Sequence, residues 1–358
     1  VKSVMTCVSS DLLALLQRAI DEKGMNQVLE ATNVVLGTVK RWQDLKSVPA
    51  QYYFDLAKLL GEEINYSEFS YREKDQFFTP PQVAAYCIKI FNKKLVELGV
   101  DESYLNYIEP SAGDGSFCNL LPSNRTISLD VEPRGKNIFK QDFLDWLPNK
   151  FENNVVIGNP PFGLRGHTAL KFMSHASFFA DFVVFILPQL FESDGRGSPK
   201  KRISGLNLIH SEKIDTAFLD PEGKEIKVNT VFQIWSKKFK TEGQDMDLSQ
   251  CRDNIRVYSL SDGGTPGTTR NKIWLEKCDI YLPSTCFGSN NMRLYKSFED
   301  LPGRKGYGVV FLKNKEQSRD IFNDIDWSKA SFKSTNSAFN LRTSIIEESY
   351  ATRLLNKT

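Results

Sequence analysis

The stretch VVIGNPPFGL, residues 155–164, joins a run of apolar residues to two consecutive prolines and an aromatic side chain. The apolar residues predict a buried strand, because short uninterrupted apolar runs are typical of parallel sheets that are covered on both faces. Proline lacks a backbone N–H and has a fixed φ, so Pro160 and Pro161 predict that the strand ends in a stiff turn. Such a turn would hold the side chains of Asn159 and Phe162 at the end of the strand.

Similar apolar runs occur on both sides of this stretch and alternate with amphipathic segments. We predict strands at residues 104–110, 126–130, 154–161 and 181–188. We predict helices at residues 82–98 and 167–179. This alternation indicates an α/β fold, doubly wound around a parallel sheet. Two later runs, 213–220 and 229–239, are separated by a short turn-like link, which predicts an antiparallel hairpin that completes the sheet.

The chain differs in character before and after this alternating region. Residues 1–70 contain short amphipathic runs and predict a small helical unit. Beyond a polar linker, residues 246–358 mix short strands, Gly-rich turns and helices, which predicts a separate α+β domain. We therefore expect three parts, with the α/β region at residues 71–245 between the other two.

One segment of the helical unit, ATNVVLGTVKRWQ, resembles the second and third helices of a helix-turn-helix. In that arrangement Thr38, Lys40 and Arg41 would lie on the helix that reads DNA. Many small helical bundles share the pattern without contacting DNA, so both interpretations stay open.

Composition limits the classes of function. The 46 Lys and Arg residues nearly balance the 44 Asp and Glu residues, for a net charge of +2, so affinity for nucleic acid would need local basic patches. The six cysteines form no C-x-x-C pair and the three histidines show no tight spacing, so we expect no metal site and a reduced, intracellular protein. The most apolar run, FFADFVVFILP, is too short to span a membrane, so we expect no membrane-spanning segment.

The run IEPSAGDGSF places Gly113 and Gly115 after a predicted strand, where the backbone can approach a ligand closely. This pattern favours a nucleotide-like cofactor, although a Gly-rich turn without a ligand shares it. The third glycine of the dinucleotide fingerprint G-x-G-x-x-G is absent, because Phe117 and Cys118 follow Ser116, and this disfavours a dehydrogenase.

Two acidic residues follow at the next strand ends. Asp130 lies where an acid that binds ribose hydroxyls is found in such folds. Asp142 lies at the following strand-to-helix turn, where it would accept from the exocyclic amine of a purine, with Phe143 as an apolar wall. A solvated carboxylate and a helix cap are the respective alternatives.

Five segments, taken together and in this order, resemble the motifs of amino-group adenine methyltransferases that use S-adenosylmethionine. They are DQFFTPPQVA (75–84), EPSAGDGSF (109–117), LDVEP (129–133), QDFL (141–144) and NPPF (159–162). The order is similar to that of the DNA adenine-N6 methyltransferases of the gamma arrangement, whose target-recognition domain is C-terminal. The resemblance covers roughly residues 75–240. It implies a seven-stranded, Rossmann-like methyltransferase sheet and a target-recognition role for residues 246–358.

The resemblance also implies residue roles in binding the cofactor. Thr79 would bond the methionine carboxylate, Asp130 would hold the ribose, and Asp142 with Phe143 would hold the adenine. The complete set expected to bind S-adenosylmethionine is Phe78, Thr79, Glu109, Ser111, Gly113, Gly115, Phe117, Asp130, Asp142 and Phe143.

The NPPF turn is the expected catalytic element, comprising Asn159, Pro160, Pro161 and Phe162. The lone pair of an amine conjugated to a purine is delocalised into the ring, so the amine is a poor nucleophile. The Asn159 side-chain oxygen and the Pro160 carbonyl can accept its two N–H bonds and direct the lone pair at a methyl donor. Phe162 offers a face on which an extruded base can stack.

Further substrate contacts are expected outside this turn. Phe232 is a candidate for the opposite face of the base, with plain core packing as its alternative. The segment SDGRGSPKKR is a candidate phosphate-binding loop, with a solvated surface loop as its alternative. Its basic residues are Arg196, Lys200, Lys201 and Arg202.

The sequence therefore predicts a site-specific methyltransferase that acts on adenine N6 of a flipped base in double-stranded DNA. A cognate restriction endonuclease is a candidate partner, and a bacterial or viral origin is expected. The alternatives are methylation of adenine in RNA, of cytosine N4 or of a glutamine amide. A DNA-binding regulator with a nonfunctional methyltransferase core is an alternative from another class, which Gly113, Gly115, Asp130 and Asn159 together disfavour.

Overall fold

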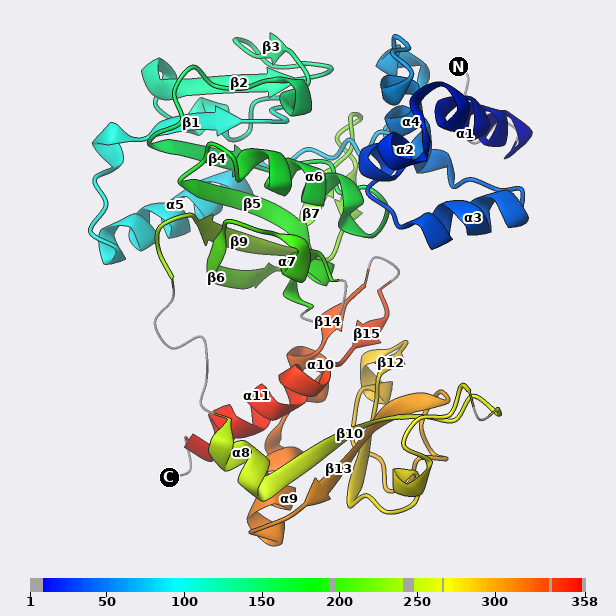
Figure 1. Cartoon of the computed structure of the whole chain (residues 1–358). Coiled ribbons are helices and arrows are strands. Elements are labelled where there is room, and N and C mark those ends of the chain that lie inside the picture. The colour runs from blue at the N-terminus through cyan, green and yellow to red at the C-terminus, as the bar shows by residue number, and fades with distance from the viewer. Residues whose placement is uncertain (1–8, 194–197, 241–247, 266, 335–336, 356–358) are drawn as a thin grey trace. The chain divides into compact units, whose positions relative to one another are not determined.

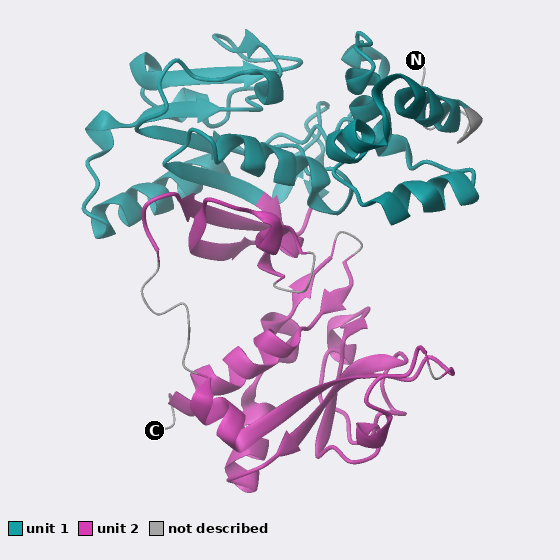
Figure 2. Cartoon of the chain, viewed as in Figure 1, with its two compact units in different colours: residues 1–186, 216–227 teal, residues 187–215, 228–358 magenta. Residues whose placement is uncertain are grey.

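The computed structural model describes residues 9–193, 198–240, 248–265, 267–334 and 337–355 (Figure 1). The chain divides into two compact units (Figure 2). One comprises residues 1–186 and 216–227, and the other comprises residues 187–215 and 228–358. These limits do not coincide with the predicted boundaries near residues 70 and 245, so the three-part division stays a prediction.

Seven strands form the largest sheet, in the order β3-β2-β1-β4-β5-β9-β6. Their bounds are β1 (Asn106–Glu109), β2 (Thr126–Asp130), β3 (Phe139–Lys140), β4 (Asn154–Gly158), β5 (Phe182–Pro188), β6 (Asn207–Ile214) and β9 (Thr230–Ser236). The pairs β1–β2, β1–β4, β2–β3 and β4–β5 are parallel, and β6–β9 is antiparallel. Strands β4 and β5 are buried along their whole lengths, which explains their uninterrupted apolar runs. The predicted α/β fold with a seven-stranded, mostly parallel sheet is confirmed.

The order of the strands reverses beside β1. The chain adds β2 and β3 on one side of β1 and then adds β4 and β5 on the other. Loops that leave β1 and β4 therefore diverge, and ligands of open α/β sheets bind at such a point, outside the carboxyl ends of the strands. Glu109 ends β1, Asp130 ends β2 and Asn159 follows β4, so three of the predicted motifs meet at this edge.

Two helices pack on the parallel part of the sheet. In the view of Figure 1, α5 (Pro81–Glu97) lies behind the strands and α6 (His167–Ala176) lies in front of them. Helix α5 begins at a proline, which suits the first turn of a helix. Its Phe91 is fully buried, and the ring centroid lies 5.6 Å from that of Phe182 on β5. Both helices match their predicted positions closely.

The predicted hairpin of residues 213–220 with 229–239 is wrong in part. Strand β9 does pair with an antiparallel neighbour, but that neighbour is residues 207–214. Residues 217–219 form β7 (Ala217–Leu219), which pairs with β8 (Glu225–Lys227) in a separate small hairpin. This separate hairpin forms because a tight turn joins β7 to β8. In the turn, the Asp220 carboxylate accepts from the backbone N–H of Glu222 and of Lys224, at 2.9 and 2.8 Å.

Four helices begin the described chain: α1 (Ser9–Lys23), α2 (Met25–Thr32), α3 (Leu36–Asp44) and α4 (Tyr53–Leu59). They share a core in which Leu16, Val28, Val39 and Leu56 are fully buried. Lys40 and Arg41 of α3 are exposed and Thr38 is half-buried. Reading of DNA by α3 stays a prediction.

The C-terminal part combines sheets and helices, as predicted. Its strands are β10 (Ile255–Ser261), β11 (Ile280–Pro283), β12 (Thr285–Cys286), β13 (Lys305–Phe311), β14 (Phe332–Lys333) and β15 (Phe339–Asn340). Its helices are α8 (Ser249–Asn254), α9 (Lys315–Asp324), α10 (Trp327–Ala330) and α11 (Thr343–Leu355). An antiparallel sheet of order β10-β13-β11 covers a core that includes Leu282, Val309 and Tyr350. Within the described ranges, no helix has the length and apolar character needed to cross a membrane.

Candidate functional site

A cavity of about 570 Å³ lies at the carboxyl ends of β1, β2 and β4. This volume is in the range of small-molecule and cofactor sites. Most of the residues predicted to bind a cofactor line it. The predicted residues that line the cavity are Phe78, Thr79, Glu109, Ser111, Gly113, Phe117, Asp130, Asp142, Phe143, Asn159 and Pro161.

The Gly-rich loop has the conformation that its glycines permit. Gly113 and Gly115 have φ of +55° and +96°, which other residues rarely adopt. A Cβ on Gly113 would lie 2.9 Å from the ring of Phe78, and a Cβ on Gly115 would lie 2.7 Å from Nδ2 of Asn119. Substitution of either glycine would therefore displace the loop or its neighbours.

Asp130 connects the end of β2 to this loop. Its Oδ2 accepts from the backbone N–H of Gly113 at 2.8 Å, and its Oδ1 accepts from that of Glu132 at 2.7 Å. Burial raises the pKa of Asp130, and these two hydrogen bonds oppose the rise. Because each carboxylate oxygen has two lone pairs, Asp130 retains acceptor capacity for the hydroxyl groups of a ligand.

Glu109 is the most deeply buried acid of the cavity wall, with 2% of its surface exposed. Its Oε2 accepts from the backbone N–H of Cys118 at 2.7 Å. Burial nevertheless raises the pKa of Glu109 to about 8. A cationic group bound beside Glu109 would favour the ionised carboxylate, because an opposite charge lowers the pKa of an acid.

Asn159 lines the cavity, and its side chain has an unpaired acceptor. Its Oδ1 is buried and has no hydrogen-bond partner among the described residues, whereas its Nδ2 donates to the carbonyl of Phe77 at 3.5 Å. The backbone carbonyl of Asn159 accepts from the Ser111 hydroxyl at 3.1 Å, which connects the NPPF turn to the Gly-rich loop. Buried polar atoms are nearly always hydrogen-bonded, so this oxygen is a candidate acceptor for a donor of a ligand.

A residue that the sequence analysis missed holds the NPPF turn from the other side. The carboxylate of Asp75 accepts from the backbone N–H of Gly163, and burial raises the pKa of Asp75 against this bond. Gly163 has φ of +67°, and a Cβ there would lie 2.2 Å from Oγ1 of Thr168. The carbonyl of Phe162 accepts from the N–H of Thr168 at 3.1 Å and so caps α6. The position of Asp75 in the segment DQFFTP, two residues before Phe77, was the signal available in the sequence.

Three of the predicted catalytic and cofactor-binding residues are not among those that line the cavity. Gly115 shapes the loop, Pro160 is buried, and Phe162 is half-buried.

The prediction that Phe232 stacks on a base is not supported by its position. Phe232 lies on β9 and is fully buried, with its ring centroid 6.2 Å from that of His210. It has no free face for a base, so the alternative of core packing describes it.

The basic segment after β5 is only partly described. Lys200, Lys201 and Arg202 belong to the short helix α7 (Pro199–Arg202), where Lys201 and Arg202 are exposed and Lys200 is half-buried. Arg196 lies outside the described residues. Phosphate binding by this segment stays a prediction.

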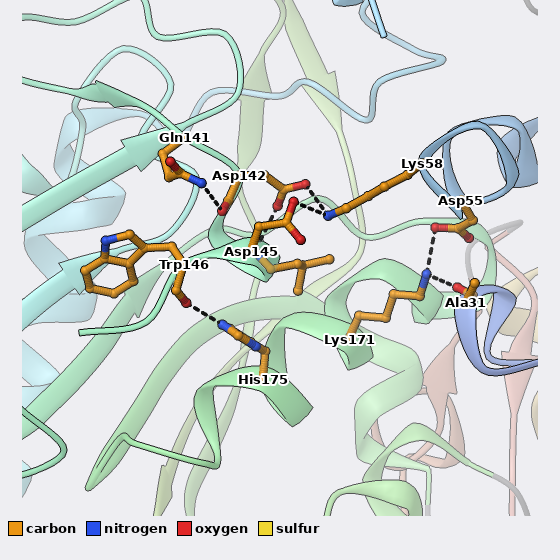
Figure 3. Close-up of polar contacts among 10 residues, drawn as sticks. Ala31, Asp55, Lys58, Gln141, Asp142, Asp145, Trp146, Lys171 and His175 are labelled. Atoms are coloured by element: carbon orange, nitrogen blue, oxygen red, sulfur yellow. Dashed lines mark hydrogen bonds and ion pairs between the residues drawn. The ribbon is translucent and has the colours of Figure 1, made fainter. Parts of the chain in front are cut away.

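Residues of the N-terminal helices also line the cavity, which the sequence analysis did not foresee. They are Ala31, Gln51, Phe54, Asp55, Lys58 and Leu59. Figure 3 shows two of the ion pairs that join this part to the α/β core, Lys58 with Asp142 and Asp55 with Lys171. Nothing in the local sequence around Lys58 indicates a partner that lies 84 residues away.

Acidic side chains outnumber basic ones in the lining. The acids are Asp55, Glu73, Asp75, Glu109, Asp114, Asp130, Glu132 and Asp142, and the bases are Lys58, Lys74 and Lys171. Lys74 pairs with Glu132, with Nζ 2.5 Å from Oε2. The balance of charge suits a cationic ligand. In the described part of the chain, no three His, Cys, Asp or Glu side chains are grouped so that they could hold a metal ion.

Several solved structures are similar to this chain, at low sequence identity. A protein assigned as an RNA methyltransferase from Pyrococcus horikoshii has 20% identity, covers 46% of this chain and 87% of its own, and has a TM-score of 0.35. A modification subunit assigned to a type I restriction enzyme from Vibrio vulnificus has 12% identity, with coverage of 62% and 59% and a TM-score of 0.34. The type IIL restriction-modification enzyme MmeI, solved in complex with DNA, has 10% identity, with coverage of 65% and 55% and a TM-score of 0.34. These values are too low to assign a function to this chain. No protein-family model and no curated protein matches the sequence.

The raised pKa of Glu109 predicts how stability depends on pH. Between pH 5 and pH 8 the folded protein keeps a proton that the unfolded chain has released, because the ordinary pKa of 4.5 rises to about 8 on folding. The free energy of unfolding should therefore fall as pH rises through this range, by up to about 1.4 kcal/mol per pH unit. Glu109→Gln keeps an acceptor for Cys118 and should remove this contribution.

Urea denaturation of both proteins between pH 5 and pH 9 measures the effect. The exposed Glu63→Gln variant is the control and should follow the wild-type curve. Parallel curves for the wild type and Glu109→Gln would show that Glu109 is ionised in the folded protein at neutral pH.

Proposed function

We propose that this protein is an S-adenosylmethionine-dependent methyltransferase that modifies adenine N6 in DNA. The observation that carries the proposal is the buried, unpaired Oδ1 of Asn159 in the wall of a cavity of cofactor size. The cavity also contains an acid at the end of each of two neighbouring strands, Glu109 and Asp130. These features lie on three of the five motifs that carry the resemblance described above.

The chemistry of the cavity fits S-adenosylmethionine. When bound, this cofactor supplies an electrophilic methyl group on a sulfonium centre. Glu109 provides a carboxylate for the ammonium of its methionine part, and Thr79 provides a hydroxyl for the methionine carboxylate. Asp130 has acceptor capacity for the two ribose hydroxyls, and the left-handed loop at Gly113 gives the space that a Cβ would fill. Asp142 and Phe143 would contact the purine.

Asn159 and Pro160 act on the acceptor amine. The Oδ1 of Asn159 and the carbonyl of Pro160 accept hydrogen bonds from the two N–H groups of the amine. This favours a tetrahedral nitrogen whose lone pair is free to attack the methyl group. Because Ser111 and Asp75 hold the turn through Asn159 and Gly163, the acceptors are fixed before the substrate arrives. The half-buried ring of Phe162 stacks on the extruded base. No covalent bond between enzyme and substrate is required.

DNA is favoured as the substrate by the chain outside the core. Residues 246–358 hold the position of a target-recognition domain, and Lys200, Lys201 and Arg202 supply charges that suit phosphates. The exposed Lys40 and Arg41 would add contacts with the DNA backbone. A cognate restriction endonuclease and an intracellular, bacterial or viral setting belong to the same proposal. RNA adenine, cytosine N4 and a protein glutamine amide are the alternative acceptors.

Sequencing of DNA from cells that express the protein, with a method that detects methylated bases, tests the acceptor. We expect N6-methyladenine at one defined sequence. Methylation confined to RNA, to cytosine or to protein would contradict the DNA adenine assignment while leaving the cofactor site intact.

Asp130→Ala should weaken binding of S-adenosylmethionine about tenfold to a hundredfold. The substitution removes the acceptor for the ribose and also releases the N–H of Gly113, and a hydrogen bond to a charged group contributes about 1.5–3 kcal/mol. Calorimetry measures the affinity. Asp101→Ala is the matched control, because Asp101 also accepts a backbone N–H at 2.8 Å but does not line the cavity. Equal affinities for the two folded variants would remove Asp130 from the cofactor site.

Asn159→Ala should reduce the rate of methyl transfer by roughly a hundredfold or more, as expected for a group that acts mainly in the transition state. Cofactor affinity should change little. The melting temperature should not fall, because Oδ1 has no partner among the described residues and the bond from Nδ2 is long at 3.5 Å. Single-turnover kinetics with labelled cofactor measure the rate. Wild-type turnover on any nucleic acid would exclude the proposed role of Asn159.

A further inference from the structure

The N-terminal helices are joined to the α/β core at the cavity through a partly buried ionic contact. Asp55 of α4 lies between two residues of α6: its Oδ1 accepts from Nζ of Lys171 at 2.6 Å, and its Oδ2 lies 2.8 Å from Nε2 of His167. Lys171 also donates to the carbonyl of Ala31 in α2 (Figure 3). Burial would raise the pKa of Asp55, but the hydrogen bond with His167 and the charge of Lys171 hold it below its usual range. Asp55 therefore stays ionised and keeps α4 on the core.

This contact orients the next turn of α4 toward Asp142. Lys58 lies three residues after Asp55, so the two side chains share one face of the helix. Nζ of Lys58 lies 2.8 Å from Oδ2 of Asp142 and 2.8 Å from Oδ2 of Asp145. The other oxygen of Asp142 accepts from the backbone N–H of Leu144, also at 2.8 Å. Both oxygens of Asp142 are thus held in place, one by the backbone and one by Lys58.

The charge of Lys58 is retained in this position. Burial lowers its pKa, but hydrogen bonds to Asp142 and Asp145 more than offset this and hold the pKa above its usual value. Without Lys58, the two carboxylates would repel each other. Phe54 and Tyr66 line the cavity from the same part of the chain, with ring centroids 5.7 Å apart and planes inclined by 15°. The N-terminal segment therefore supplies both a cation and an aromatic wall next to Asp142.

We propose that Lys58 is a positioning residue for recognition of the purine amine of the cofactor: it fixes the Asp142 carboxylate in the orientation that accepts from the 6-amino group. The inference rests on the proposed function, because it takes the cavity to bind S-adenosylmethionine. It assigns to the N-terminal helices a part in building the cofactor site, beyond any contact with DNA. Lys58 does not need to leave when the cofactor binds, since Oδ2 of Asp142 has a second lone pair.

The test compares two ligands that differ at one position of the purine. The probes are S-adenosylhomocysteine and its analogue with hydrogen in place of the 6-amino group. In the wild-type protein we expect the first to bind on the order of tenfold to a hundredfold more tightly, because only the first can donate to Asp142. Lys58→Ala should lower this ratio at least roughly fivefold, and Lys58→Arg should largely restore it.

Three further variants isolate the effect. In an Asp142→Ala background, Lys58→Ala should not lower the ratio further, because the residue acts through Asp142. Lys58→Gln keeps most of the length of the side chain but removes its charge, and it should lower the ratio as Lys58→Ala does. If the Lys58→Ala variant does not fold, Lys58→Gln takes its place in the test. Lys23→Ala, an exposed lysine of the same helical part, should bind both probes as the wild type does.

Each result separates the inference from the proposed function. Equal weakening of both probes by Lys58→Ala, with an unchanged ratio, would show a merely structural role and overturn the inference. Tighter binding of S-adenosylhomocysteine would also overturn it, because Lys58 would then compete with the purine. If the wild-type protein binds neither probe, the proposed cofactor site is wrong and the inference fails with it.

Discussion

The reversal of strand order beside β1 is the constraint on which the site depends. Because β2 and β4 lie on opposite sides of β1, the segments that follow these three strands diverge and leave space between them. Hydrogen bonds between side chains and backbone then hold the edges of that space: the Asp130 carboxylate accepts from the N–H of Gly113, and the Ser111 hydroxyl donates to the carbonyl of Asn159. The Gly-rich loop and the NPPF turn are therefore positioned by the sheet and by each other.

Charge is distributed unevenly around the cavity. Glu109 is buried and Asp75 is half-buried, and no cation pairs with either carboxylate among the described residues; burial raises the pKa of both. Asp55 and Asp142 instead have lysine partners. The wall beside Glu109 is thus suited to receive a positive group from a ligand, whereas the wall at Asp142 is already neutralised by the protein and is suited to a neutral purine.

The unpaired oxygen of Asn159 has an energetic cost in the folded protein. A buried acceptor without a partner typically costs about 1–3 kcal/mol. The adjacent prolines and the bond between Asp75 and Gly163 hold the turn in this conformation despite that cost. An acceptor kept ready in this way can gain hydrogen bonds when an amine enters, which is the physical basis of preorganised catalysis.

The sequence by itself determined strands β1, β2, β4 and β5, the two helices on the sheet and the residues at its carboxyl edge, because burial and backbone conformation leave local patterns, whereas the two-residue strand β3 was not predicted. Uninterrupted apolar runs identified β4 and β5. Gly113 marked the turn after β1, which needs a positive φ, and Pro160 marked the stiff turn after β4. Only the tertiary structure decided the pairing of β6 with β9, the complete burial of Phe232, and the contacts of Asp55 and Lys58 with the core. Those features depend on residues far apart in the chain, such as Lys58 and Asp142, and a single side chain carries no local mark of a distant partner.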